Sequence, residues 1–581
     1  MTSFIKFSII SFLVFLSCFW SPPVTSDSTL QAESLAVPAS DFAASLKSAI
    51  HVVQQVSMFV AQYKNASKDF RVTNAVSDCL NLLDLSDQAL NWSLAASLSP
   101  NGSTDPNCLR VPFDRFVASV NSTIHRVGKM TSSFASESYN ISRDCLRVSN
   151  ALSDCLELLD TSADQLGWTL EALLNPLRTK VGTGDLSSDL RTWLSSVIVN
   201  LDSCKELLDH GRSNNNSKIS LGKELKKIAS LVLHTLAMVH PNRNANDETQ
   251  QRPFWLELRR RKLVQACKES ANAVVALDGS GQFTSINKAV KSAPKHSPEP
   301  FVIYVKRGVY NEYVVVKKNK WNIVMIGDGM DATIITGSRS VADGLKTYHS
   351  ATFSVKGRGF IGKDMTFENT AGPEKHQAVA FLSDSDQSVL YRCSFRGYQD
   401  TLYTHNNRQF YKECVITGTI DFIFGHGTVV FQDCQVIARK GLPDKNNTIT
   451  AQGRKSLGRF SAFSLQSCNI TVTPEAVAAS VETYLGRPWK RYSTTVVMQS
   501  EISAGISPQG WLPWSGEYAL DTLYYGEYMN VGSGADVSKR VGWPGFHVIT
   551  DAAVAEGYTV ANLIAGNAWL PSTGIPYKAG L

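Results

Sequence analysis

The sequence predicts two domains of different fold class, an all-α helical bundle followed by a mainly β solenoid. Residues 40–238 carry apolar residues at helix-face spacings, as in LRVSNALSDCLELLDTSADQLGWTLEAL (146–173). From about residue 270, short runs rich in Val, Ile, Phe and Tyr alternate with Gly, Asn and Asp. Successive runs recur at intervals of about twenty residues, which favours stacked coils over a β-sandwich.

The first residues are typical of an export signal. Lys6 precedes the apolar run IISFLVFL (9–16), and small residues follow near VTSDS (24–28). The run is too short for a comfortable membrane span, so residues 1–26 are interpreted as a cleaved signal peptide rather than a stable anchor. Eleven cysteines agree with export. Glycosylation sequons occur at Asn65, Asn91, Asn101, Asn121, Asn140, Asn215, Asn446 and Asn469.

Residues 40–238 are predicted to form the helical bundle, which contains a duplicated unit. The segment 72–92 matches 148–168 and aligns Cys79 with Cys155. The apolar stripe of the second copy is interpreted as core packing rather than a cofactor site. It comprises Leu152, Cys155, Leu156, Leu159 and Leu166.

Residues 239–264 are polar and read as a linker to the β domain at 265–581. Four consecutive basic residues lie within it: Arg259, Arg260, Arg261 and Lys262. In an exported chain this cluster predicts either a processing-protease site or a solvated charge run, and the sequence leaves both open.

The charge balance bears on the class of partner. A net charge of +6 suits an acidic polymer. Nucleic acid is a poor candidate, because the chain is predicted to be exported and carries no basic helix or aromatic RNA-binding motif.

Two aspartates twenty-one residues apart, Asp400 in YQDTL and Asp421 in TIDFIF, mark the candidate site. If one coil takes about 21 residues, they occupy equivalent places on successive coils, roughly 4.8 Å apart. Gln377 lies 23 residues before Asp400, and Gln399 adjoins it. The pattern therefore predicts two carboxyl groups and two amides in one patch.

Two carboxyl groups at that separation do not both ionise cheaply, so one is expected to stay protonated beside a charged partner. In one chemistry, an aspartate attacks an ester carbonyl, the amides hold the oxyanion and the other aspartate protonates the leaving alcohol. In another, the pair cleaves a glycosidic bond. The amides favour ester chemistry, and a merely structural stack stays open.

The run YLGRPWKRYS (484–493) adds Arg487 and Trp489 on a predicted loop. Arg487 is suited to hold an aspartate in its charged form or to bind a substrate carboxylate. Trp489 is suited to stack on a sugar ring, although packing alone would also explain it. The chain has no G-x-S-x-G elbow and no cluster with metal-ligand spacing, so neither a serine triad nor a catalytic metal is predicted.

Five motifs together resemble the plant pectin methylesterases. They are GVYNE (308–312), HQAVAF (376–381), GYQDTLY (397–403), DFIFG (421–425) and LGRPW (485–489), in the order seen in that family. The helical half is similar to the invertase/pectin methylesterase inhibitor domain, especially around ALSDCLELLD and SSVIVNLDSCKELLDH. The chain thus resembles a precursor with an inhibitor-like pro-domain ahead of an enzyme.

The resemblance implies a right-handed parallel β-helix that hydrolyses methyl esters of cell-wall homogalacturonan without a cofactor. It implies that Asp421 is the nucleophile and Asp400 the acid and then the base. Gln399 and Gln377 would stabilise the oxyanion, and Arg487 would orient Asp421. The implied substrate-binding residues are Thr347, Tyr348, Tyr403, Phe424 and Trp489, together with Gln377 and Arg487.

The resemblance also carries expectations about partners and location. The expected partner is methyl-esterified pectin, with a proteinaceous inhibitor and a processing subtilase as further candidates, in the plant cell wall.

Stacking suggests a disulfide Cys393–Cys414 and the resemblance suggests Cys434–Cys468, while Cys414–Cys434 stays open. Phe381 stands where the family usually has Leu, Tyr348 where Phe is commoner and His426 where Asn is typical, which predicts tuned subsites rather than lost activity.

Overall fold

The structure is a computed structural model that describes residues 117–129, 146–174, 181–209, 216–239 and 268–581. By its internal contacts the chain divides into two units, Met1–Gly102 and Ser103–Leu581, and every described residue belongs to the second. The predicted signal peptide, the first copy of the duplicated segment and the basic cluster at 259–262 lie outside the described residues.

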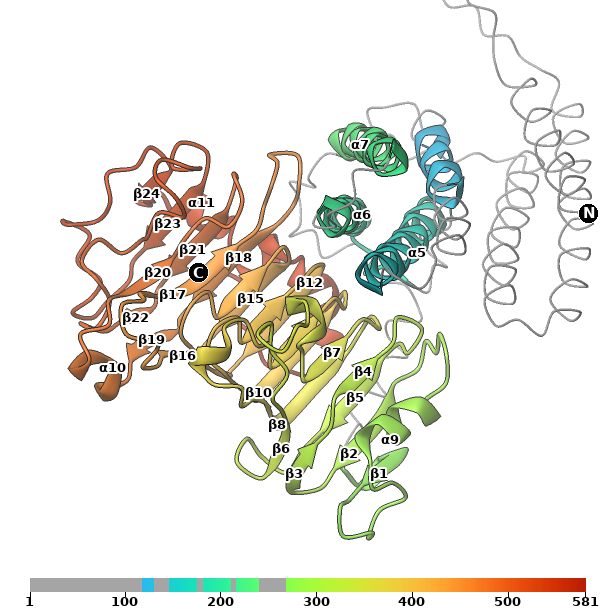
Figure 1. Ribbon diagram of the computed structural model, residues 1–581, viewed down its shortest axis with the longest axis horizontal. Coiled ribbons are helices and arrows are strands. Elements are labelled where there is room, and N and C mark those ends of the chain that lie inside the picture. Colours follow the sequence, from blue (N-terminus) through green and yellow to red (C-terminus); the bar gives the residue numbers. More distant parts are fainter. Residues whose placement is uncertain (1–116, 130–145, 175–180, 210–215, 240–267) are drawn as a thin grey trace, which may run out of the picture. The chain divides into compact units, whose positions relative to one another are not determined.

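The C-terminal part is a parallel β-helix, as predicted, with strands stacked in three columns (Figure 1). The strand pairs of the columns are parallel and in register, for example Leu402↔Ile423 and Gln435↔Asn469. The long strands β8 and β10 each run through the first and second columns. The register advances by one coil per strand, and this fixes which residues become neighbours.

Each column consists of strands with the following residue ranges. The first column contains β1 (Ala273–Val275), β2 (Phe301–Val305), β5 (Ile323–Ile326), β8 (Ile361–Asn369), β10 (Ser388–Arg396), β12 (Arg408–Lys412), β15 (Thr428–Gln432), β18 (Ala462–Gln466), β21 (Thr494–Met498), β23 (Tyr524–Tyr528) and β24 (Phe546–Val548). The second contains β3 (Gly308–Asn311), β6 (Thr333–Gly337), β13 (Val415–Gly418), β16 (Gln435–Ala438), β19 (Asn469–Val472) and β22 (Glu501–Ile502). The third contains β4 (Val314–Val316), β7 (Phe353–Val355), β9 (Phe381–Ser383), β11 (Leu402–Thr404), β14 (Ile423–Gly425), β17 (Asn447–Gln452) and β20 (Thr483–Gly486).

A left-handed residue turns the chain between the first and second columns on successive coils. Its φ is 49° at Arg392, 52° at Glu413 and 53° at Asp433. Each is followed directly by a buried cysteine. The regular spacing of the cysteines in the sequence therefore reflects one repeated corner of the coil.

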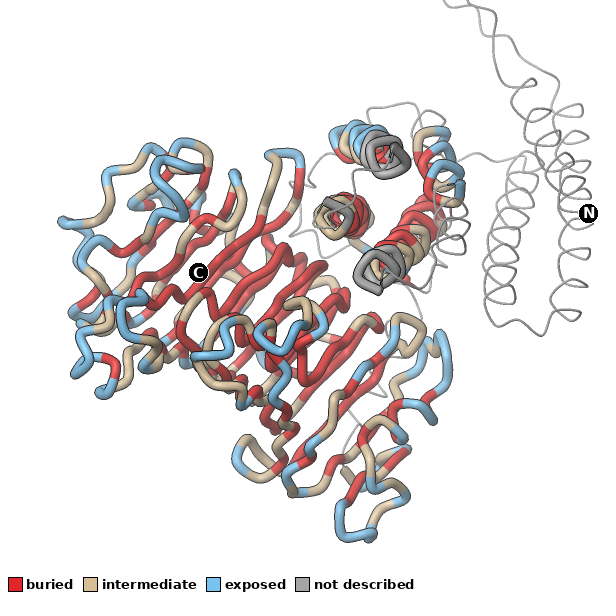
Figure 2. The backbone as a smooth tube through the Cα atoms, viewed as in Figure 1, coloured by how far each residue is buried: buried red, intermediate tan, exposed pale blue. Residues whose placement is uncertain are grey.

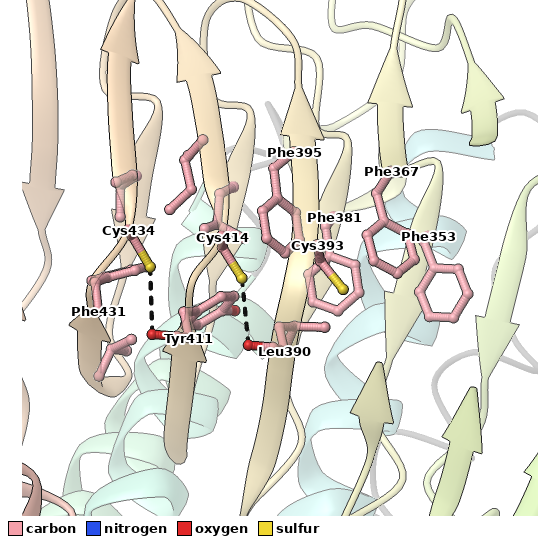
Figure 3. Packing of buried hydrophobic residues seen from close by; sticks show 14 of the residues in the cluster. Phe353, Phe367, Phe381, Leu390, Cys393, Phe395, Tyr411, Cys414, Phe431 and Cys434 are labelled. Carbon is pink, nitrogen blue, oxygen red and sulfur yellow. Dashed lines mark hydrogen bonds between the residues drawn. The ribbon is translucent and has the colours of Figure 1, made fainter. Parts of the chain in front are cut away.

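The buried cysteines that follow these corners on successive coils form a column, which we call the cysteine ladder. Its four members are free thiols, so neither predicted disulfide is formed in this structure. The residues that follow them are in register, Ser394↔Val415 and Val415↔Gln435. In-register side chains on parallel strands stay about one strand spacing apart, whereas a disulfide draws its Cβ atoms to about 3.8 Å. The thiols instead lie close to backbone carbonyls, as at Cys414 Sγ–Leu390 O, 3.4 Å (Figure 3). The ladder comprises Cys393, Cys414, Cys434 and Cys468.

Apolar side chains fill the interior of the coils, and buried residues run along the strands (Figure 2). Aromatic rings stack inside at the centre of the β-helix (Figure 3). Phe381 lies between Phe353, at 5.5 Å between ring centroids, and Phe395, at 5.3 Å. Rings at these separations add to the stability gained from area burial alone.

The GVYNE motif has a structural role at the N-terminal end of the β-helix. The Glu312 carboxylate accepts hydrogen bonds from the backbone N–H groups of Ile286 (2.9 Å) and Asn287 (3.2 Å) and from the Ser285 hydroxyl. It therefore caps helix α9 (Ile286–Ser292), whose first N–H groups lack helical partners. The helix buries Ile286, Ala289 and Val290 against the first coils.

The remaining helices are short and lie mostly near the C-terminus. They are α10 (Pro474–Ala478), α11 (Ala552–Glu556), α12 (Val560–Leu563) and α13 (Gly566–Trp569).

The described part of the helical half contains a helical stretch at 117–129 and three longer helices, α5 (Leu146–Leu174), α6 (Leu186–Asp209) and α7 (Asn216–Ala237). A disulfide between Cys155 and Cys204 joins α5 to α6. Cys155, Leu159 and Leu166 are fully buried, whereas Leu156 is only half-buried. Among the described helices, none is long and apolar enough to span a membrane.

Candidate active site

The two aspartates occupy equivalent positions on consecutive coils. Asp400 lies two residues before β11 and Asp421 two residues before β14, and these strands pair with Leu402 opposite Ile423. The backbone N–H of Asp400 donates to the carbonyl of Ile420 at 3.1 Å. The register therefore agrees with the argument from the spacing of twenty-one residues.

Both aspartates have left-handed backbone conformations, with φ of 62° at Asp400 and 51° at Asp421. Asp tolerates this region better than most residues because its short polar side chain bonds locally. Both side chains are largely buried, at 7% and 5% exposed. The same turn thus presents one carboxyl group on each coil.

Asp421 is held by a bidentate ion pair. Arg487 donates from Nε to Oδ1 at 2.7 Å and from Nη2 to Oδ2 at 2.6 Å. Such a fork favours the charged carboxylate. Thr448 Oγ1 makes a further hydrogen bond to Oδ1 at 2.7 Å.

Asp400 has a different environment. Burial raises the pKa of its carboxyl group well above the ordinary value, and the neighbouring charge of Asp421 raises it further. Among the described residues, no side chain or backbone group hydrogen-bonds this carboxyl group. The two carboxyl groups therefore differ in environment: burial favours the protonated form of Asp400, whereas Asp421 is paired with the Arg487 guanidinium.

The two glutamines lie on adjoining coils. The backbone N–H of Ala378 donates to the carbonyl of Gln399 at 3.1 Å, so Gln377 lies one residue away from the register partner of Gln399. Both side chains are half-buried. Neither side-chain amide bonds a described residue, so both can donate to a ligand.

Aromatic residues predicted to bind substrate gather around the acids. Tyr403 and Phe424 stack at 4.2 Å on neighbouring strands β11 and β14. The ring centroids of Trp489 and Phe424 lie 6.0 Å apart, and Tyr348 packs edge-on against Tyr403 with 6.5 Å between ring centroids. Thr347 precedes Tyr348 in the 3₁₀ turn η2 (Thr347–His349). The structure brings these predicted residues together.

The motif analysis did not select Thr448 as a site residue. It is the second residue of β17 and lies opposite Tyr484 of β20. In the sequence it appears only as the last residue of the sequon at Asn446. Nothing in the local pattern indicates that it faces Asp421, because the coil between them contains a loop that breaks the twenty-residue spacing.

A model of the pectinesterase family matches residues 272–567, which include every residue of the candidate site. The chain belongs to the pectinesterase family. It is therefore a carboxylic ester hydrolase of the class that acts on pectin, as the motifs predicted. A second family model, plant invertase/pectin methylesterase inhibitor, matches residues 95–238.

Plant relatives of this pectinesterase share both parts. The "pectinesterase/pectinesterase inhibitor PPE8B" of Prunus persica is 54% identical over 487 residues, which is 83% of this chain and 92% of the relative. The "probable pectinesterase/pectinesterase inhibitor 44" of Arabidopsis thaliana is 48% identical over 500 residues, 81% of this chain and 94% of the relative. The solved pectin methylesterase from carrot is 50% identical, with a TM-score of 0.54, and covers 54% of this chain and 99% of its own.

In this pectinesterase, helices α5 and α6 contact the loops beside the site through acidic side chains. Asp154 bonds Lys346 (3.0 Å) and His349 (2.9 Å), which flank Tyr348. Glu206 pairs with Lys490, next to Trp489, at 2.7 Å. We call the β-helix side of these pairs the basic rim: Lys318, Lys346, Lys356, Arg408, Lys455, Arg459 and Lys490.

The centre of this contact is buried. The Arg408 side chain is fully inaccessible and pairs at 2.8 Å with Asp386 of the β-helix and with Asp189 of α6. Trp193 of α6 donates to Asp386 at 3.0 Å. A charge buried this deeply is tolerated only because it is paired on both sides.

Proposed function

We propose that this pectinesterase removes methyl groups from homogalacturonan, with Asp421 as nucleophile and Asp400 as acid and base. The observation that carries the proposal is the contrast between the two carboxyl groups. Asp421 is bound by Arg487 through two hydrogen bonds, whereas burial and the charge of Asp421 raise the pKa of Asp400. An ionised nucleophile beside a protonated acid is what this route of ester cleavage requires.

In the first half of the proposed reaction, a carboxylate oxygen of Asp421 attacks the carbonyl carbon of the methyl ester. The carbonyl electrons move to its oxygen, where the amides of Gln377 and Gln399 donate hydrogen bonds to the oxyanion. As the oxyanion collapses, the bond to the methoxy group breaks and Asp400 gives that oxygen its proton. Methanol leaves, and an acyl anhydride remains on Asp421.

In the second half, the carboxylate of Asp400 takes a proton from water while the water oxygen attacks the acyl carbon. The bond to Asp421 breaks, and the galacturonic acid product gives its carboxyl proton to the solvent as it leaves as galacturonate. Asp421 returns ionised and Asp400 returns protonated, so the cycle balances as one ester and one water converted to methanol, galacturonate and a proton. The two aspartates carry the proton transfers to methanol and from water, and no cofactor takes part in these steps.

The proposed substrate contacts use the aromatic residues around the acids. Trp489, Tyr403, Phe424 and Tyr348 offer flat apolar faces for sugar rings. Thr347 offers a hydroxyl group beside them. Arg487 lies near enough to the site to contact a substrate carboxylate as well as Asp421.

The test is methanol release from methylated pectin by the purified chain. Asp421→Asn is expected to reduce the rate by at least about 10³-fold, because it removes the nucleophile but keeps the shape. Near-normal release by a folded Asp421→Asn protein would refute the assignment. New reducing ends or unsaturated ends without methanol would instead support a depolymerising enzyme.

The helical half is proposed to act as a pro-domain that restrains the enzyme until the chain is cut near Arg259–Lys262. The acidic contacts of α5 and α6 with the basic rim support this, since they lie against the loops that carry Tyr348 and Trp489. Full activity of the uncut precursor, compared with the cut form, would contradict it. A subtilase is the proposed processing enzyme.

We also propose that the chain is secreted to the cell wall after loss of the signal peptide at 1–26, with a pro-domain at 40–238, a linker at 239–264 and the enzyme at 265–581. Asn121, Asn446 and Asn469, the sequon residues that the structure describes, are all exposed. Their exposure is compatible with glycans on an exported protein.

A further inference from the structure

Thr448 lies directly against Asp421 and is fully buried. Its register follows from β14 and β17, where Ile423 pairs with Thr450. The backbone N–H of Thr448 donates to Thr419 O at 3.1 Å, and its carbonyl accepts from Phe422 N–H at 3.4 Å. Because these bonds fall on both sides of Asp421, the position of Thr448 relative to the aspartate is fixed by the β-helix itself.

The Thr448 hydroxyl group makes two hydrogen bonds to the same aspartate. It accepts from the backbone N–H of Asp421 at 2.9 Å and bonds the Asp421 carboxylate Oδ1 at 2.7 Å. A backbone N–H only donates and an ionised carboxylate only accepts. The hydroxyl proton must therefore point to Oδ1, so Thr448 is a donor to the carboxylate.

This donor makes the two carboxylate oxygens unequal. Oδ1 accepts from Thr448 and from Arg487 Nε, whereas Oδ2 accepts, among the residues that the structure describes, only from Arg487 Nη2. A carboxylate offers about four acceptor sites, two on each oxygen. Both sites on Oδ1 are occupied, and one site on Oδ2 stays open.

We propose that Thr448 is a positioning residue of the reaction: it fixes the left-handed Asp421 and its carboxylate so that Oδ2 is the attacking oxygen. The inference rests on the proposed role of Asp421 as nucleophile. Thr448 itself touches no reacting atom of the substrate. It acts by restricting the rotation of the carboxylate, and a displaced nucleophile slows attack even when substrate still binds.

The sequence offers a competing reason for a threonine here, because Asn446, Asn447 and Thr448 form a glycosylation sequon. Replacing Thr448 with a residue other than Ser would remove both the hydroxyl group and the sequon. Asn446 is exposed, whereas Thr448 is buried. Asn446→Gln therefore removes the sequon and leaves the contact with Asp421 intact.

The experiment measures kcat and KM for methanol release from methylated pectin by the full chain. Thr448→Ala and Thr448→Ser both remove the buried methyl group, but only Ser keeps the hydroxyl donor. We expect Thr448→Ala to lower kcat by about 10- to 100-fold with little change in KM. Thr448→Ser should stay within about threefold of wild type, and Asn446→Gln should match wild type.

Other outcomes overturn the proposal. Equal kcat values for Thr448→Ala and Thr448→Ser would show that the hydroxyl group has no role in positioning. A loss in Asn446→Gln as large as that in Thr448→Ala would assign the effect to glycosylation. Thr448→Val, which keeps the side-chain volume, replaces Thr448→Ala if that variant does not fold.

Asp421→Asn separates this proposal from the one on which it rests. An inactive Asp421→Asn with an unimpaired Thr448→Val would reject only the role of Thr448. An active Asp421→Asn would reject the nucleophile and the positioning role with it.

Discussion

His426 is a buried imidazole that stacks on Trp489 at 4.6 Å between ring centroids. Its Nδ1 lies 2.7 Å from the carbonyl oxygen of Gly453. A carbonyl only accepts, so Nδ1 carries the proton and Nε2 is bare in the neutral ring. Burial, followed by the neighbouring His405, lowers the pKa of His426 to about 3. The ring therefore stays neutral in the folded protein through the acidic range.

This residue predicts a loss of stability in acid. The unfolded chain binds a proton at His426 below about pH 6.5, whereas the folded chain does so only near pH 3. The stability that the neutral His426 ring contributes to the folded protein is therefore lost as pH falls from about 6.5 toward 3. We measure the free energy of unfolding by urea titration at pH 7 and at pH 4.5. We expect its fall between these pH values to be about 2–3 kcal/mol smaller in His426→Asn than in wild type.

The matched control for this titration is His376→Asn, since His376 is exposed. That variant should follow wild type at both pH values. An unchanged pH dependence in His426→Asn would show that the imidazole is protonated in the folded protein.

Packing inside the coils acts at the scale of the element. Phe381 on β9 is fully buried and contacts rings from three neighbouring elements, β7, β8 and β10. The phenyl ring therefore fills space between the walls of the β-helix and links its columns. The strand is only three residues long and pairs with β7 on one side and β11 on the other, so the Phe381 ring adds to the contacts that hold it in place.

We expect Phe381→Ala to lower the free energy of unfolding by about 3–5 kcal/mol, because a cavity replaces a ring that neighbouring coils cannot fill. Phe381→Leu, the residue usual in the family, should cost less because more of the volume is kept. Val309→Ala, at a side chain that is 59% exposed, is the control and should change stability by less than about 0.5 kcal/mol. Equal losses for Phe381→Ala and Val309→Ala would contradict the packing argument.

At the scale of the whole molecule, acidic side chains on the helices form ion pairs with basic side chains on the β-helix. Asp202 of α6 bonds Lys455 at 3.0 Å and also pairs with Arg459. The Arg459 side chain is almost fully buried in this contact. Because the Arg459 guanidinium is shielded from water, the Asp202 carboxylate is needed to balance its charge. Burial also lowers the pKa of Arg459 to about 9. The helical part and the basic rim therefore stabilise one another.

Charge reversal at this contact tests the restraint by the helical part. Asp202→Lys is expected to raise methanol release by the uncut chain by about fivefold or more, since roughly 1 kcal/mol of lost docking energy shifts the equilibrium by that factor. Lys226→Glu changes an exposed charge on α7 and should leave the rate unchanged. An unaltered rate in a folded Asp202→Lys chain would argue against the restraint.

The sequence by itself determined the order of the two folds and most of the candidate site. A coil length of about 21 residues placed Asp400 beside Asp421, because each coil repeats the same corners and strands. The motif order selected Arg487 and the aromatic residues. These features depend on short-range pattern, which a linear sequence records directly.

Tertiary structure decided what the coil length does not encode. The loop between β16 and β17 breaks the regular spacing, and only the pairing of β14 with β17 brings Thr448 to Asp421. Stacking suggested a Cys393–Cys414 disulfide and the family resemblance a Cys434–Cys468 disulfide, yet these four cysteines are buried free thiols on the in-register strands. The pKa of Asp400 likewise depends on burial by residues distant in the chain, because desolvation is a property of the packed coil and not of the motif.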